Sequence, residues 1–185
     1  MTIYILDSDP AVCAKALDDK SLHQMIKDIA QVLVQFSQNF TYSGKRLHNS
    51  APFNKKVIAS LLPWYKWAQE IKANYLYLLE LGNACLAEHE LRGFAWKGKA
   101  RDYVKAIFWA HDNIPDLPIH VDFRTSNAIS TPLPLVMPKK YIRYRFPDMI
   151  EPEDKITSYR NYYQANFKIN TNRWTNRQPP DWLTV

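Results

Sequence analysis

Two groups in the first quarter of the chain could take part in chemistry, an α-amine at Thr2 and a carboxylate at Asp28. Once Met1 is removed, Thr2 carries the α-amine, whose reference pKa of about 8 leaves part of it neutral and nucleophilic at pH 7. This amine gains catalytic meaning where a carboxylate is held nearby. Asp28 lies at the edge of the apolar face of a long helix, where it is half-desolvated. Its purely structural role would be that of a boundary carboxylate paired with Lys27 or with the neighbourhood of Lys20.

Three segments in the last 50 residues mix cations with aromatic side chains. Cations neutralise phosphates, and aromatic rings stack on unpaired bases at about 1–3 kcal/mol each. The mixture therefore favours contact with nucleic acid. The alternative is that the tyrosines belong to the core and the cations to a solvated face. The candidate nucleic-acid-binding residues are Lys139, Lys140, Arg143, Arg145, Tyr159, Arg160, Tyr163, Arg173, Trp174 and Arg177.

Other chemistries lack their usual spacing in this sequence. The five histidines form no i, i+4 pair and there is no CxxC, so we expect no metal. Neither GxxxxGK[ST] nor GxGxxG occurs, and we expect no cofactor. Cys13 and Cys85 each lie in an apolar helical pattern, which predicts buried free thiols in a reducing compartment.

The amino-acid composition limits the classes of protein to which the chain can belong. The 185 residues are 46% hydrophobic and 23% charged with a net charge of +6, which is ordinary for a globular chain and excludes a disordered or collagen-like one. The presence of only 4 glycines argues against a β-rich fold of tight turns. No segment is long and apolar enough for a bilayer, and the N-terminus does not resemble a signal peptide. We expect a cytoplasmic protein without a membrane partner, in the host cytoplasm if the protein is viral.

The elements that must position these residues are helices. Asp9-Pro10 opens a short helix that ends near Leu17, after an extended arm or short strand at 3–6. Asp18 or Asp19 caps the next helix, which has an apolar 3.6-residue period over four turns. Further helices are predicted at 54–61, from Pro63 to near Gly93, at 101–112 and at 154–167. On the helix at 101–112, one buried face is predicted to hold Tyr103, Val104, Ile107, Phe108 and His111.

The segment 115–152 differs from the rest because it holds seven of the twelve prolines and has no convincing helical or alternating pattern. It is predicted to be a long, ordered surface loop, a kind that is often functional. No repeat or domain boundary is evident. The sequence therefore predicts a mainly α-helical, single-domain bundle over 1–185, with a short N-terminal extended arm and this proline-rich loop.

Segments spread over nearly the whole chain match one known pattern. They are Ile5–Pro10, Leu17–Lys20, Met25–Leu33, Trp67-Ala68, Ala73–Tyr75, Glu88–Arg92, Tyr159–Tyr163, and Trp174 with Arg177, Pro180 and Trp182. In these segments the chain resembles a phage-type family of uncharacterised proteins. That family is in turn distantly similar to the pyrimidine-dimer DNA glycosylases of the phage endonuclease V type.

The resemblance implies a small all-helical DNA glycosylase with AP-lyase activity. By position, the Thr2 amine would attack the sugar C1′, and Asp28 would stabilise the cationic intermediate and assist strand cleavage by β-elimination. The partner would be double-stranded DNA with a damaged or modified base, bound by a monomer.

Four positions depart from the family pattern. Asp28 stands where the pattern has Glu, and Ser21 where it has Arg or His. Leu62 and Ala100 stand where the pattern has histidines. The departures leave open a non-catalytic nucleic-acid-binding protein, a degenerate copy of that enzyme family. A third hypothesis, ranked last, is a small-molecule or nucleotide-modifying enzyme with the proline-rich loop as a lid.

Overall fold

α-Helices make up most of the described chain. The structure is a computed structural model that describes residues 3–39, 41–42, 45–46, 61–98, 100–119, 121–122, 127–128, 131–136, 154–166 and 172–183. Its helices are α1 (Pro10–Ala16), α2 (Asp19–Asn39), α3 (Leu62–Glu70), α4 (Lys72–Leu91), α5 (Ala100–Asp112) and α6 (Lys155–Ala165). Two short antiparallel hairpins pair β1 (Thr41–Tyr42) with β2 (Lys45–Arg46) and β3 (Val121–Asp122) with β4 (Asn127–Ala128). The predicted class, a mainly α-helical bundle, is confirmed.

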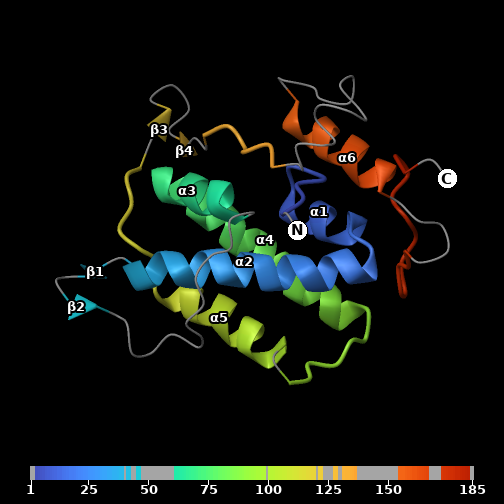
Figure 1. Ribbon diagram of the computed structural model, residues 1–185, viewed down its shortest axis with the longest axis horizontal. Helices are drawn as coiled ribbons and strands as arrows, with labels where there is room; N and C mark the ends of the chain where they lie inside the picture. The colour runs from blue at the N-terminus through green and yellow to red at the C-terminus, as the bar shows by residue number, and fades with distance from the viewer. Residues whose placement is uncertain are drawn as a thin grey trace.

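The helix α2 runs across the middle of the molecule (Figure 1) and begins at a side-chain cap. Asp18 Oδ1 accepts the backbone N–H groups of Lys20 and Ser21 at 3.0 and 3.2 Å. These bonds satisfy N–H groups that have no partner within the helix. Asp18, rather than Asp19, is therefore the cap. Asp9 caps α1 in the same way, as the sequence predicts.

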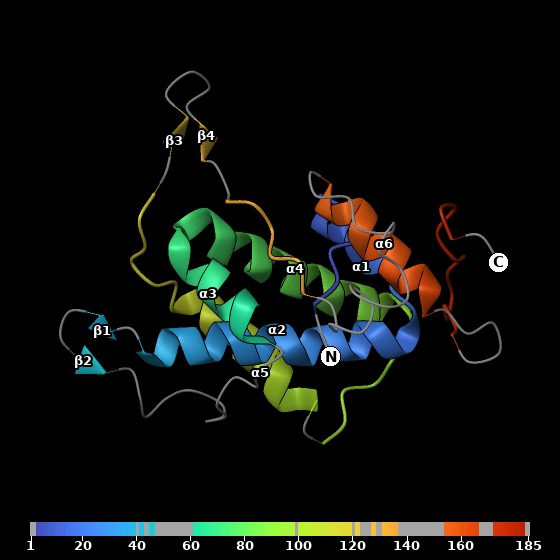
Figure 2. The same ribbon diagram turned by 45° about the horizontal axis from the view of Figure 1, so that its top comes forward.

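The core lies where α2 packs on α4 and α5, and both views show these helices together (Figures 1 and 2). Gly82 of α4 allows the close approach. A Cβ at this position would lie 3.1 Å from Ile29 Cγ2 and 3.4 Å from Ile107 Cδ1. These side chains are fully buried. The packing at Gly82 therefore fixes α2, the helix that carries Asp28, against the rest of the bundle.

Where the sequence predicts one helix from residue 63 to 93, the structure has two, α3 and α4. Ile71 separates them with an extended backbone, φ −149° and ψ 158°. The partners around the break come from other parts of the chain: the N–H of Lys72 donates to the Pro118 carbonyl at 2.8 Å. Asn74 Nδ2 donates to the Trp67 carbonyl at 2.8 Å. The prediction is wrong here because it reads only local periodicity.

The helix α5 buries a different face from the one predicted. Ala106, Ile107 and Ala110 are fully buried, whereas Phe108 is 57% exposed and His111 is exposed. The two alanines bring α5 close to the core, and this rotates the large aromatic outward. The placement of Phe108 and His111 on the buried face is therefore wrong. The helix predicted at 54–61 lies outside the described residues, apart from its last position.

Parts of the proline-rich segment lie against the body. Trp67 Nε1 donates to the Thr131 carbonyl at 3.1 Å, and the Tyr159 hydroxyl donates to the Pro134 carbonyl at 2.6 Å. Residues 131–136 are therefore held by α3 and α6. Elsewhere, both cysteines, Cys13 and Cys85, are buried and free, as predicted.

Candidate active site

Asp28 belongs to a polar stripe along α2. Gln24, Asp28, Gln31 and Gln35 follow helical spacing, so they project within about 60° of one another around the helix. Asp28 and Gln31 are buried, with 1% and 5% of their surface exposed. Among the described residues, Asp28 Oδ2, Gln31 Oε1 and Gln35 Oε1 are buried without a hydrogen-bond partner, and Trp64 Nε1 of α3 is a further such atom. Because buried polar atoms are normally paired, this concentration marks the stripe as a candidate site.

The two oxygens of the Asp28 carboxylate have different surroundings. Gln24 Nε2 donates to Oδ1 at 2.5 Å, one helical turn away, while Oδ2 has no partner. Burial raises the pKa of Asp28, and the hydrogen bond from Gln24 opposes that rise, as do the positive charges of Lys27 and the chain's N-terminus. The carboxylate is more deeply buried than the sequence predicts. It is hydrogen-bonded to Gln24 and not ion-paired with a lysine, so the alternative in which Asp28 pairs with a lysine is not observed.

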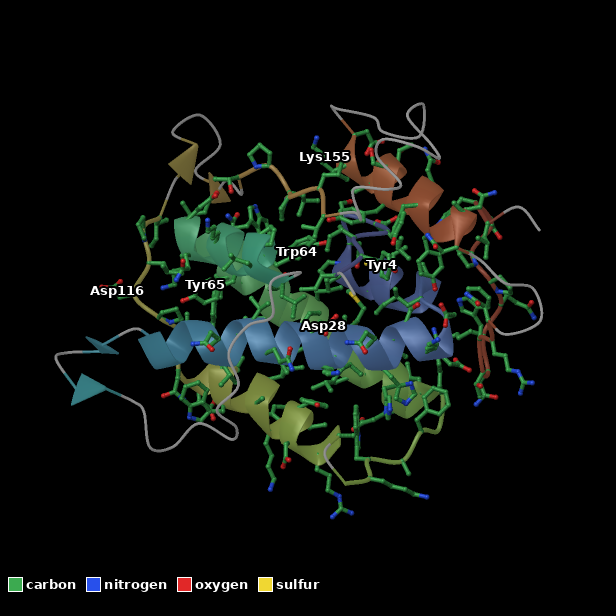
Figure 3. All side chains as sticks on the ribbon, viewed as in Figure 1. Tyr4, Asp28, Trp64, Tyr65, Asp116 and Lys155 are labelled. Carbon is green, nitrogen blue, oxygen red and sulfur yellow. The ribbon has the colours of Figure 1, made fainter. Side chains whose placement is uncertain are left out.

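The extended arm begins beside the Asp28 turn of α2. The Tyr4 N–H points to Met25 Sδ at 3.2 Å, and Met25 precedes Asp28 by one turn. Figure 3 labels Tyr4, Trp64 and Asp28 in the central part of the molecule. Thr2, two residues before Tyr4, lies outside the described residues.

The arm is fixed in place by contacts from α1 and α4, in addition to α2. Ile3, Ile5 and Leu6 are fully buried. The Leu6 N–H donates to Cys13 Sγ at 3.3 Å, and the Tyr77 hydroxyl donates to the Asp7 carbonyl at 3.3 Å. These contacts give residues 3–7 a defined position relative to α2.

Arg160, one of the predicted nucleic-acid contacts, also holds this arm. Its Nε donates to the Leu6 carbonyl at 2.7 Å, and its Nη2 pairs with Asp7 Oδ2 at 2.9 Å. The guanidinium carbon lies 5.4 Å from the ring centroid of Trp182. These contacts hold the arm in place, so Arg160 has a structural role in this arrangement.

The two predicted base-stacking tyrosines are core residues. Tyr159 is fully buried, and its hydroxyl also accepts the Val136 N–H at 3.0 Å. Tyr163 is 4% exposed, and its hydroxyl donates to the cap residue Asp18. A base cannot stack on either ring in this arrangement. The structure therefore corresponds to the alternative interpretation, in which the tyrosines belong to the core.

Two of the C-terminal candidates, Trp174 and Arg177, hold the C-terminal segment against the helices. Trp174 Nε1 donates to the Ala16 carbonyl at 3.1 Å. Arg177 makes two hydrogen bonds to the Glu88 carboxylate, at 2.9 and 3.0 Å. Arg173 has an exposed side chain. The candidates Lys139, Lys140, Arg143 and Arg145 lie outside the described residues.

Sequence reasoning missed two parts of this site. The hydrogen bond from Gln24 to Asp28 is not predicted from the sequence. Their i, i+4 spacing was the available signal. The unpaired Trp64 Nε1 could not be anticipated, because α3 is distant in sequence from α2.

No family model, curated protein or solved structure matches this chain. Within the described ranges, no group of three or more metal-ligating side chains comes together. None of the described helices is both long enough and apolar enough to cross a membrane.

Proposed function

We propose that the protein is a DNA glycosylase with AP-lyase activity that uses the Thr2 amine as its nucleophile. The observation that carries the proposal is that the arm lies beside the part of α2 that carries Asp28. Tyr4 contacts Met25, one helical turn before Asp28, and one oxygen of the buried Asp28 carboxylate has no partner among the described residues. The net charge of +6 favours a polyanionic partner.

In the proposed reaction, the amine lone pair forms a bond to C1′ of the sugar. The bond from C1′ to the base breaks, and the base leaves with the electron pair and takes up a proton. Loss of the amine proton and opening of the ring give an imine, whose protonated form is cationic. Removal of a C2′ proton then breaks the C3′–O bond and cleaves the strand, and water hydrolyses the imine to restore the amine.

Asp28 would stabilise the cationic imine through its unpaired oxygen. A fixed charge inside a poorly solvated site acts more strongly than the same charge in water, and it needs little reorganisation during the reaction. Gln24 holds the other oxygen, so the free oxygen has a defined direction. Ionised Asp28 is the active form, and its raised pKa predicts that activity falls as the pH drops toward the acidic range.

Borohydride trapping on an abasic duplex tests this chemistry directly, because reduction of the imine leaves a stable protein–DNA bond. We expect trapping by the protein with its native N-terminus, none after the amine is blocked, and at least 10-fold less with Asp28→Asn. The matched control is Asp116→Asn, an exposed carboxylate at the periphery of the molecule (Figure 3). Equal trapping by the blocked protein would refute the proposal.

A second outcome would identify the alternative function. DNA binding without any trapped product, and unchanged by Asp28→Asn, would assign the chain to non-catalytic nucleic-acid-binding proteins. That binding should weaken with increasing salt, because phosphate contacts release counterions.

A further inference from the structure

A pocket of about 520 Å³ lies between α2, α5 and the segment that connects α4 to α5. α2 contributes Lys20, His23 and Lys27 to its wall, and Trp96 and Tyr103 come from the connection and from α5. None of the residues that line it is acidic. The pocket is large enough to hold a small molecule rather than a few waters.

The charge of the pocket is not neutralised within the described part of the chain. Lys20 and Lys27 are seven residues apart, so they project from the same side of α2. Among the described residues, neither ammonium group forms an ion pair. Two unneutralised cations on one wall favour an anionic ligand, and the hydrogen-bonding capacity of an ammonium suits phosphate oxygens.

The opposite wall favours a planar aromatic ligand. The Trp96 ring stacks on His89, with ring centroids 3.6 Å apart and an interplanar angle of 16°. His89 is buried and is braced by Phe94, whose ring centroid is 5.2 Å away. One face of the indole is thus occupied by a rigid support, and the indole also lines the pocket. Tyr103 adds a second aromatic side chain.

We infer that this pocket binds a nucleoside monophosphate unit, with the base against Trp96 and the phosphate at Lys20 and Lys27. The unit is either a free nucleotide or one nucleotide of a strand. Gln24 lines the pocket and also donates to Asp28, so the pocket adjoins the candidate active site. The inference depends on the lining of the pocket and not on the imine chemistry of Thr2.

The test is a titration of the full chain with dTMP, with a labelled single-stranded tetranucleotide and with inorganic phosphate. We expect Trp96→Leu to weaken nucleotide binding about 10-fold, and Trp96→Phe to preserve most of it, because a ring remains for stacking. Lys20→Gln and Lys27→Gln should each reduce the salt dependence of tetranucleotide binding by about 0.7 in slope. Lys105→Gln, an exposed lysine of α5 outside the pocket, is the matched control.

The three ligands separate the outcomes. Tighter binding of dTMP than of the tetranucleotide identifies a free nucleotide as the ligand, and the reverse order identifies a strand. Inorganic phosphate that binds as well as dTMP, with no effect of Trp96→Leu, overturns the inference. So does nucleotide binding that none of the pocket variants changes. Circular dichroism confirms that each variant is folded.

The same titration with the Asp28→Asn protein separates this inference from the proposed function. Nucleotide binding should persist in that variant, because the carboxylate does not line the pocket. Failure of borohydride trapping with intact nucleotide binding would remove the proposed lyase chemistry and leave the pocket assignment standing. If the pocket variants lose nucleotide binding and wild-type protein is trapped normally, both the pocket assignment and the proposed lyase chemistry are supported.

Discussion

Replacement of Asp28 by asparagine should stabilise the fold while it removes the proposed activity. The wild-type carboxylate is 1% exposed, it accepts one hydrogen bond, from Gln24, and its second oxygen is unpaired. Asparagine keeps an acceptor for Gln24 and carries no charge. Its new amide nitrogen takes the place of Oδ2, the oxygen without a partner among the described residues. The substitution therefore removes a desolvation cost and leaves the packing nearly unchanged.

The size of the effect follows from the burial of that one unpaired oxygen. An unsatisfied buried polar group costs about 1–3 kcal/mol, more when it is charged. Since the amide of asparagine is only partly satisfied, we expect a gain of about 1–2 kcal/mol at pH 7. In a chain of this length each kcal/mol corresponds to about 3 °C, so Tm should rise by about 3–6 °C.

The gain should depend on pH in a specific direction. Burial raises the pKa of Asp28 in the folded state above its value in the unfolded chain. Such a group contributes stability that is present below the unfolded pKa, of about 3.9, and is lost as the pH rises through the folded pKa. The advantage of Asp28→Asn over wild type should therefore be small near pH 4 and grow as the pH rises to 7.

Thermal unfolding between pH 4 and 7 measures this advantage, with Asp116→Asn as the exposed control. An asparagine variant that is less stable than wild type at pH 7 would refute the reasoning, because it would show that the carboxylate is a structural partner. We expect Asp28→Asn to gain stability and to lose borohydride trapping. This combination indicates a residue that contributes to activity and lowers the stability of the fold.

Three further predictions concern the contacts that hold the site in place. Glu88→Gln should cost about 1–3 kcal/mol in urea denaturation, because it weakens a charged hydrogen bond to the buried Arg92, which keeps only Asp19 as a charged partner; an unchanged midpoint would contradict this. Although burial alone would raise the pKa of Glu88, hydrogen bonds from arginines hold it low, so the wild-type stability from this carboxylate should be lost as the pH falls below about 4. Gly82→Ala should destabilise by about 1–3 kcal/mol through contact with Ile29 Cγ2, and Ile29→Leu, which lacks this methyl group, should recover part of that loss, whereas strictly additive effects would rule out the contact. Trp174→Leu should free the C-terminal segment, which limited proteolysis would detect as earlier cleavage than in wild type.

Local signals in the sequence were sufficient for most helices. The caps at Asp9, Asp18 and Asp154 and the 3.6-residue period of α2 act over a few residues, so the expected starts agree with the structure. They fail at Ile71, where the break between α3 and α4 is accompanied by bonds to Pro118 and to residue 131. Such partners leave no periodic trace in the sequence.

The same limit applies to the candidate site. The sequence determined which residue types are present: an amine at Thr2, an acid at Asp28, and clusters of cations with aromatics. The tertiary structure decided which of them are free to act. It buried Tyr159 and Tyr163, engaged Arg160 and Arg177 in contacts within the fold, and placed the arm beside α2. Composition and spacing could not separate these outcomes, because burial and pairing depend on contacts between elements that are distant along the chain.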